Sequence, residues 1–177
     1  EEADWDRVLK QLDYCRAAKE EGARLIPHVG ARPVNILLSW DGTINPFSFH
    51  ANFAALSMMS HEERLKELQK PELRAAMIAE DLPLMGDEFM DTIIGGYDKL
   101  YPLGDPPDYE PGPEDSIAAR AERAGVTPQE LCYDTMMAND GKGVVYFPCF
   151  GYGSNDLSRQ VKLLEDESTV LSLADTG

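Results

Sequence analysis

The closing stretch of the sequence, from Ser154 to Gly177, limits the possible folds more than any other. Its pattern predicts a helix, a short turn and a buried strand from Thr169 to Ala174, with Asp175 directly after the strand. In α/β proteins, functional groups sit at the carboxyl ends of strands, because the strand fixes the side chain while the following loop opens to solvent. Asp175 is therefore the leading candidate for a functional residue. The sequence ends at Gly177 with no helix after the strand, and we expect that it was cut from a longer chain.

The amino-terminal part has the same order of helix and then strand. Apolar residues at three- and four-residue steps predict a first helix that stops at Gly22, namely Trp5, Val8, Leu9, Leu12 and Cys15. A strand from Leu25 to Gly30 follows, and Pro27 and Gly30 indicate that it ends or bulges there. His28 and Arg32 are thereby expected, like Asp175, at the carboxyl end of a strand. The two ends of the sequence together predict an α/β fold.

The section between these two strands predicts mainly helices and loops. Ser60 and Glu63 form a capping box, in which each side chain binds the other residue's backbone amide, and Thr127 and Glu130 form a second. Other expected elements are a helix from Pro71 to near Asp81, a loop from Tyr101 to Pro113, a helix from Glu114 to Gly125 and a strand within Val144 to Phe150 that ends at Pro148. An aromatic patch, Phe47, Phe49 and Phe53, precedes the first capping box.

The charge excludes two classes of partner. The chain has 16 basic and 32 acidic residues, a formal charge of -16. Such a surface repels phosphate backbones and anionic lipid headgroups, so neither nucleic acid nor a membrane is expected as a partner. No apolar run approaches the roughly 20 residues that cross a bilayer, and the first residues do not resemble a signal peptide. We expect a cytoplasmic protein.

Length limits the size of the fold, and the spacing of the cysteines indicates their chemical state. A chain of 177 residues suffices for one ordinary domain, but a complete (β/α)8 barrel typically needs roughly 250. Cys15, Cys132 and Cys149 are far apart and form no Cys-x-x-Cys pair, so we interpret them as reduced or buried thiols.

The order of several motifs resembles the N-acyl-D-amino-acid deacylases (D-aminoacylases) of the amidohydrolase superfamily. The motifs are Arg32-Pro-Val-Asn-Ile-Leu-Leu, Asn45-Pro-Phe with the nearby His50, Ser60-His-Glu-Glu-Arg-Leu-Lys, Pro71-Glu-Leu-Arg-Ala and Ser116 to Pro128. The most specific part is the end of the sequence, where a helix with Val161 and Leu164 leads into Ser168-Thr-Val-Leu-Ser-Leu-Ala-Asp-Thr-Gly. In that family the sequence continues into Gly/Ala-His, which is missing here.

The resemblance implies a fold: part of a (β/α)8 (TIM) barrel, its last strands, with a largely helical lid. Residues 1–32 would hold a barrel helix and strand seven, 33–150 the lid insertion, and 151–177 a barrel helix and strand eight. The chain would then be a fragment of one larger catalytic domain, and the remainder of the barrel would be its partner.

The resemblance also implies an activity, the zinc-dependent hydrolysis of the amide bond of N-acyl-D-amino acids. Asp175 matches the family's strand-eight aspartate, which transfers protons during hydrolysis and is a candidate metal ligand. Arg32 is expected to pair with the substrate carboxylate and His28 to contact the acyl group, at positions where several family members carry tyrosines and a serine. The zinc ligands would lie mostly outside this chain, so the fragment alone is expected to be inactive. His50 and His61 are expected at the surface or in packing.

Two alternatives remain open. The same fold could act on another amide or on a cyclic amide, since one side-chain change in the pocket decides the substrate. Otherwise the chain is a free-standing acidic interaction module without catalysis, which binds a partner through Phe47, Phe49 and Phe53.

Overall fold

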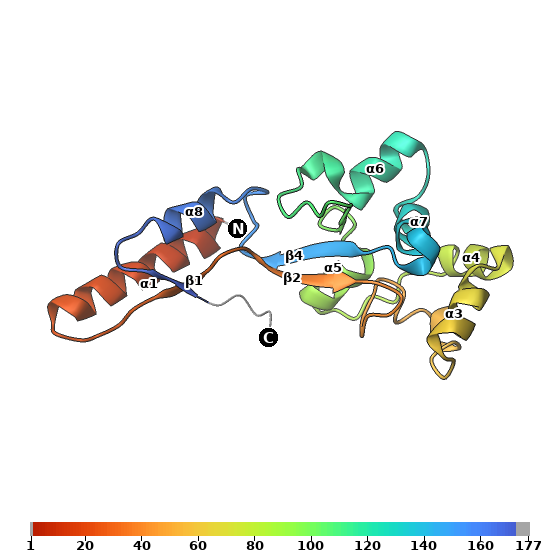
Figure 1. Ribbon diagram of the computed structural model, residues 1–177, viewed down its shortest axis with the longest axis horizontal. Coiled ribbons are helices and arrows are strands. Elements are labelled where there is room, and N and C mark those ends of the chain that lie inside the picture. The colour runs from red at the N-terminus through yellow and green to blue at the C-terminus, as the bar shows by residue number, and fades with distance from the viewer. Residues whose placement is uncertain (1, 173–177) are drawn as a thin grey trace. The chain divides into compact units, whose positions relative to one another are not determined.

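The computed structural model describes residues 2–172 of the chain, and side chains from Trp5 onward. It is a mixed α/β structure that divides into two compact units (Figure 1). The terminal unit comprises Glu1–Asn35 and Pro148–Gly177, and the inserted unit comprises Ile36–Phe147. Among residues 2–172, none of the helices is both long enough and apolar enough to cross a membrane.

The terminal unit is built from two helix-and-strand pairs. Helix α1 (Glu2–Glu20) leads to strand β1 (His28–Gly30), and helix α8 (Ser158–Leu164) leads to strand β5 (Val170–Ser172). The two strands are neighbours and run parallel, with His28 beside Val170 and Gly30 beside Ser172. Figure 1 shows α1 and α8 side by side next to this strand pair. The predicted order of helix and strand at both ends of the chain is therefore confirmed.

Two expectations about these strands are wrong. The first strand begins at His28 and not at Leu25, because Pro27 offers no N–H to a sheet and Leu25 and Ile26 are exposed. The expected burial of the last strand also fails, since Val170 and Leu171 are 43% and 66% exposed and no further element covers them among the described residues. Residues 173–177, which include Asp175, lie outside the described part.

The inserted unit is mainly helical, as expected. Its first and last elements, β2 (Val34–Leu38) and β4 (Val145–Phe150), extend beyond its bounds into the terminal unit. Between them, in chain order, are α2 (Ala51–Ala54), α3 (His61–Leu68), α4 (Pro71–Ile78), α5 (Glu88–Gly95), β3 (Tyr101–Pro102), the 3-10 turn η1 (Pro113–Asp115), α6 (Ile117–Ala124) and α7 (Pro128–Gly141). The strands form one sheet in the order β2-β4-β3, with β3 antiparallel to β4. Strand β4 continues past Pro148, where we expected it to end, and the missing N–H of Pro148 costs the β3–β4 pairing nothing, because β3 pairs only with Val145 and Tyr146.

Local signals place several helix ends correctly. Both capping boxes are present, Ser60 with Glu63 at the start of α3 and Thr127 with Glu130 at the start of α7. Gly125 ends α6 in the left-handed conformation, which glycine adopts at little cost. Helix α5 was not expected, although Asp87 caps it by accepting a bond from the Met90 amide.

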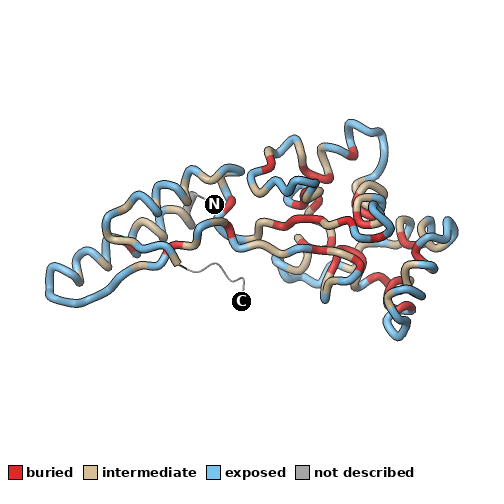
Figure 2. Tube along the Cα trace, viewed as in Figure 1, coloured by how far each residue is buried: buried red, intermediate tan, exposed pale blue. Residues whose placement is uncertain are grey.

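The core of the inserted unit is an aromatic cluster around Trp40. Its ring lies 5.5 Å from Phe47, 5.5 Å from Phe53 and 5.1 Å from Tyr133. The Tyr133 hydroxyl donates a hydrogen bond to the carbonyl of Leu68 at 2.5 Å, which satisfies its polar end inside the core. Figure 2 shows buried residues along β4 and on several helices of this unit.

This cluster corrects the expected partner surface. Phe47 is 0% exposed and Phe53 is buried beside it, so only Phe49, at 40%, presents much of its ring to solvent. The three phenylalanines therefore do not form an exposed patch, because Phe47 and Phe53 are buried in the core.

Candidate functional site

The candidate site lies at the carboxyl edge of the β1–β5 pair. In a parallel pair both carboxyl ends face the same edge, and the register puts Gly30 directly beside Ser172. Arg32 follows Gly30 by two residues, and Asp175 follows Ser172 by three in the sequence. The geometry thus brings the ends of two strands together, each followed closely in sequence by one of the charged residues singled out above.

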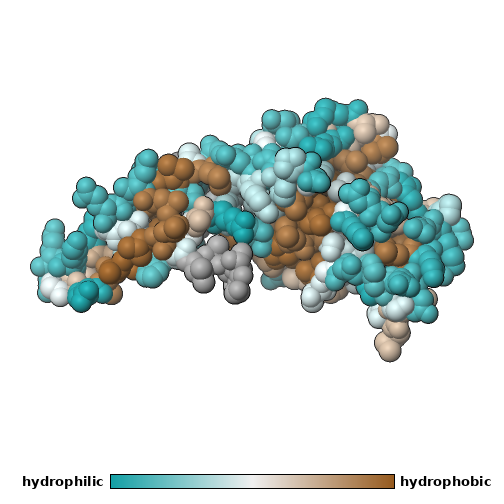
Figure 3. All heavy atoms as spheres, viewed as in Figure 1, coloured by the Kyte–Doolittle hydropathy of each residue, from teal (hydrophilic) through white to brown (hydrophobic). Residues whose placement is uncertain are grey.

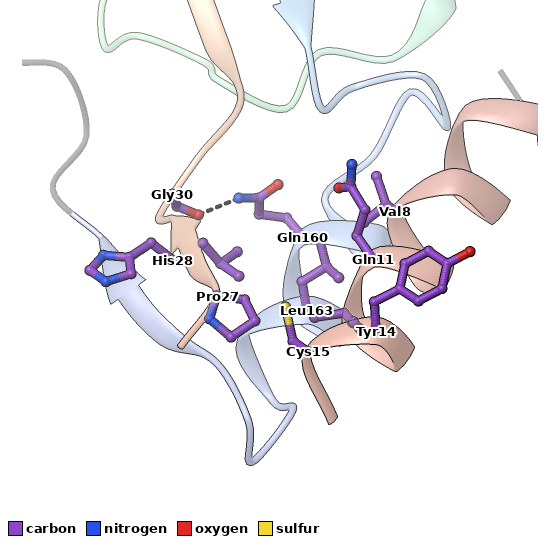
Figure 4. A pocket seen from close by; sticks show the side chains of 11 residues that line it. Val8, Gln11, Tyr14, Cys15, Pro27, His28, Gly30, Gln160 and Leu163 are labelled. Atoms are coloured by element: carbon purple, nitrogen blue, oxygen red, sulfur yellow. Dashed lines mark hydrogen bonds between the residues drawn. The ribbon is translucent and has the colours of Figure 1, made fainter. Parts of the chain in front are cut away.

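Of the three residues predicted from the sequence, only Arg32 is found at this edge among the described residues. Arg32 is half-buried and lies just beyond β1. His28 occupies the first position of β1, so it lies at the strand's amino end and not at the carboxyl end as expected. Its ring is exposed, and Figure 4 shows it pointing away from Cys15 and Leu163. Asp175 is outside the described residues, and its place stays a prediction.

A polar side chain that the sequence analysis missed, Gln160, also reaches this edge. Its Nε2 donates a hydrogen bond to the carbonyl oxygen of Gly30 (Figure 4). Gln160 lies on α8 three residues before Leu163, and both line the same groove against β1. A polar residue on the sheet-facing side of a helix was the signal that could have revealed it. Val161 and Leu164, the two apolar residues named for this helix in the sequence analysis, are both exposed.

Two sets of contacts fix the position of α8. Trp5 of α1 lies under two cations of α8, with Arg159 5.4 Å and Lys162 5.7 Å from its ring centre. At the other end, Asp156 accepts hydrogen bonds from the Ser158 hydroxyl and amide and from the Ser154 hydroxyl. The Ser158 hydroxyl, followed by the other two donors, lowers the pKa of Asp156, so its carboxylate stays charged before the first turn of α8.

The loop after α8 is tied to α1 in the same way. Arg16 of α1 forms an ion pair with Asp166, and Asp166 accepts bonds from the hydroxyl and the amide of Ser168. These bonds, with that of the Ser168 hydroxyl the strongest, lower the pKa of Asp166. The amide of Val170 then donates to Pro27 at 3.0 Å, which joins β5 to the start of β1.

The two chain segments that leave the terminal unit run side by side. The Cys149 thiol donates to the carbonyl of Val34 at 3.3 Å. Gly151 has a φ of 85°, and a Cβ on it would lie 3.7 Å from Pro33 and 3.4 Å from the Gln160 Oε1 atom. The chain therefore departs after β1 and returns before α8 at one place, next to Gln160.

A groove of about 580 Å³ lies between α1, α8 and β1. Its lining is mostly apolar and includes Val8, Leu12, Cys15, Val29 and Leu163 (Figure 4). Of the lining residues, His28 turns its ring away from Cys15 and Leu163. We therefore assign the groove to packing and place the candidate chemistry at the strand edge.

The described residues provide no metal centre. Within residues 2–172, no three histidine, cysteine or carboxylate side chains gather closely enough to hold a metal ion. All three cysteines are free thiols. Burial raises the pKa of the Cys132 thiol, which makes it unreactive in its apolar surroundings, and burial also raises the pKa of Cys149.

The two other histidines belong to the inserted unit. His50 is fully buried 5.2 Å from the Phe47 ring, and neither ring nitrogen has a hydrogen-bond partner among the described residues. Burial lowers its pKa, against the opposing charge of Glu80, so the ring is neutral near pH 7. His61 is half-buried and pairs with Asp41. His50 is thus a packing residue, as expected.

Comparisons with models of protein families, with curated proteins and with solved structures found no match to this chain.

Proposed function

We propose that this chain is part of a metal-dependent amidohydrolase that cleaves the N-acyl amide bond of N-acyl-D-amino acids. The observation that carries the proposal is the parallel pairing of β1 and β5, each preceded by its own helix, with the inserted unit between them in sequence. Consecutive strands of a (β/α)8 barrel are parallel neighbours of this kind, and insertions after a strand's carboxyl end cover the active site. The motif order from Arg32 to Asp175 supports the same family.

The exposed apolar residues of the terminal unit support its place in a larger barrel. Figure 3 shows a band of apolar side chains on the face of this unit that is in view. The exposed large apolar residues of this unit are Tyr14, Leu25, Ile26, Val34, Phe150, Val161, Leu164, Val170 and Leu171. Strands of a complete barrel are covered on both faces, so neighbouring strands and helices would bury much of this surface.

The proposed roles follow from position. Arg32 binds the substrate carboxylate through two parallel hydrogen bonds, which its planar guanidinium allows. Asp175 takes a proton from the attacking water and gives it to the leaving nitrogen. Zinc would supply a water of lowered pKa, and its ligands would come mainly from the remainder of the barrel, since the described residues hold no such cluster. His28 is exposed at the amino end of β1, so the proposal gives it no role at the carboxyl edge.

The test uses the natural gene product that contains this chain, loaded with zinc. We expect hydrolysis of N-acetyl-D-amino acids, and we expect Asp175→Asn to lower kcat by roughly 10²- to 10⁴-fold with zinc content retained. Asp6→Asn, on the exposed face of α1, is the matched control and should leave kcat unchanged. Full activity in Asp175→Asn would remove the proposed role, and hydrolysis of cyclic amides alone would favour the alternative substrate class.

A further inference from the structure

Gln160 lies where the end of β1 meets the two chain segments that connect the units. Its Nε2 donates to the carbonyl of Gly30, the last residue of β1. Its Oε1 faces Gly151 on the returning segment, at 3.4 Å from where a Cβ on that residue would be. One side-chain amide therefore binds the last residue of β1 and lies close to the returning segment.

The bond to Gly30 bears directly on the direction of the chain toward Arg32. The Gly30 carbonyl and the Ala31 amide share one rigid peptide plane, so fixing the carbonyl fixes the plane from which Ala31 and Arg32 continue. Only one residue separates this plane from Arg32. The bond is part-buried, so loss of the Gln160 donor would leave this carbonyl without that partner and allow the peptide plane to rotate.

The position of Gln160 is itself fixed by contacts of its helix, so its side chain can hold the Gly30 peptide plane. Its neighbour Arg159 and the following Lys162 lie against the Trp5 ring, and Asp156 accepts a bond from the Ser158 amide at the start of α8. With residues 159 and 162 turned to α1, helix periodicity turns residues 160 and 163 to β1.

We propose that Gln160 is a positioning residue for substrate binding: its amide fixes the carboxyl end of β1 so that Arg32 meets the substrate carboxylate. The inference rests on the proposed function, because it assigns Arg32 that role. Gln160 acts through Gly30 and does not itself touch the substrate.

Two variants of the zinc-loaded natural protein test the proposal. Gln160→Met keeps the length of the side chain without a donor, and Gln160→Glu replaces the donor with an acceptor. For N-acyl amino acids, both should raise KM about tenfold and leave kcat within about twofold, because binding geometry changes and the reacting groups do not. For the matching N-acyl amino-acid amides, which lack the carboxylate, KM should stay within about twofold. Gln11→Glu, an exposed glutamine of α1 in the same unit, is the matched control and should change neither constant.

Two kinetic results would overturn the proposal. An unchanged KM for the acid substrates would show that Gln160 does not position Arg32. An equal rise in KM for acids and amides would mean that the variants disturb the site in general.

Amide hydrogen exchange provides a readout that does not depend on activity. In Gln160→Met, the amides of Ala31, Arg32 and Gly151 should exchange about tenfold faster, while those of α6 and α7 keep their rates. If the natural protein cleaves no N-acyl amino acid, the proposed function fails and the Arg32 role fails with it. Unchanged exchange at residues 31, 32 and 151 would independently refute the contact as a determinant of the β1 end.

Discussion

The two units differ in how completely each buries its own apolar residues. In the inserted unit, Trp40, Phe47 and Tyr133 are almost fully buried and pack on one another at 5.1–5.6 Å. In the terminal unit, both residues of β5 that pair with His28 and Val29 are substantially exposed, and the main buried apolar residues are Leu12, Val29 and Tyr152. A unit with its own core can fold by itself, whereas a two-stranded sheet is marginal without further strands. The difference is what we expect if, as proposed, the inserted unit is self-sufficient and the terminal unit is part of a larger sheet.

The largest expected effect lies in the core of the inserted unit. Phe47→Ala removes a fully buried ring from the Trp40 cluster and should lower the free energy of unfolding by about 3–5 kcal/mol. Phe49→Ala, two residues away with its ring 40% exposed, should cost less than about 1 kcal/mol. Denaturant unfolding of both variants measures the contrast. Equal losses would mean that the cluster does not form the core.

A smaller loss is expected when one polar contact of this core is removed. Tyr133→Phe deletes the hydroxyl that donates to Leu68 and leaves that carbonyl without this donor, which should cost about 1–2 kcal/mol in the same unfolding experiment. Burial raises the pKa of Tyr133 to about 12, so the lost donor is a neutral phenol at any pH used. Tyr14→Phe, on the exposed face of α1, is the control and should be neutral. If Tyr133→Phe leaves the free energy of unfolding unchanged, the hydroxyl does not contribute to stability.

The pH dependence of the inserted unit tests the burial of His50. Because burial lowers its pKa in the folded state, the unfolded chain binds the proton more readily, and stability should fall as pH drops below about 6.5. Between pH 7.5 and 5.5 the carboxylates remain charged, so a shift of the unfolding midpoint reports mainly on histidine. His50→Asn should flatten the profile. If stability still falls with pH to the same extent in His50→Asn, the pH dependence does not come from the burial of His50.

The smallest effect is expected on the exposed strand of the terminal unit. Leu171→Ala should cost less than about 0.5 kcal/mol in the 177-residue chain, because Leu171 is 66% exposed. In the natural gene product the same substitution should cost roughly 2–5 kcal/mol, since the proposed barrel covers this strand. Equal costs in both proteins would mean that nothing further packs on β5.

Much of the fold could be predicted where the signal is local. The capping boxes at Ser60 and Thr127 and the stop at Gly125 depend on residues within three or four positions, and the structure confirms them. The helix at Glu88–Gly95 was missed although its cap at Asp87 is equally local. The order of helix and strand at both ends was also correct, because apolar spacing reports on it.

The errors concern properties that depend on distant partners. The burial of Phe47 and Phe53 follows from Trp40 and Tyr133, and no pattern near the phenylalanines reveals it. Burial of the last strand was inferred from its apolar residues. Apolar content shows that a strand can be buried, but it does not show whether another element packs on it. Gln160 was missed because its partner, the Gly30 carbonyl, lies 130 residues away in sequence.

Amide hydrogen exchange, compared between the 177-residue chain and the natural gene product, tests most directly whether the terminal unit is a fragment of a larger sheet. We predict that the amides of Val29, Gly30 and Leu171 exchange rapidly in the 177-residue chain and become strongly protected in the natural protein, where flanking strands pair with β1 and β5. The amides of α6 and α7 should exchange at the same rates in both, as fits a unit with its own core. Equal protection of β1 and β5 in the two proteins would contradict the account, because it would make the terminal unit complete without further strands.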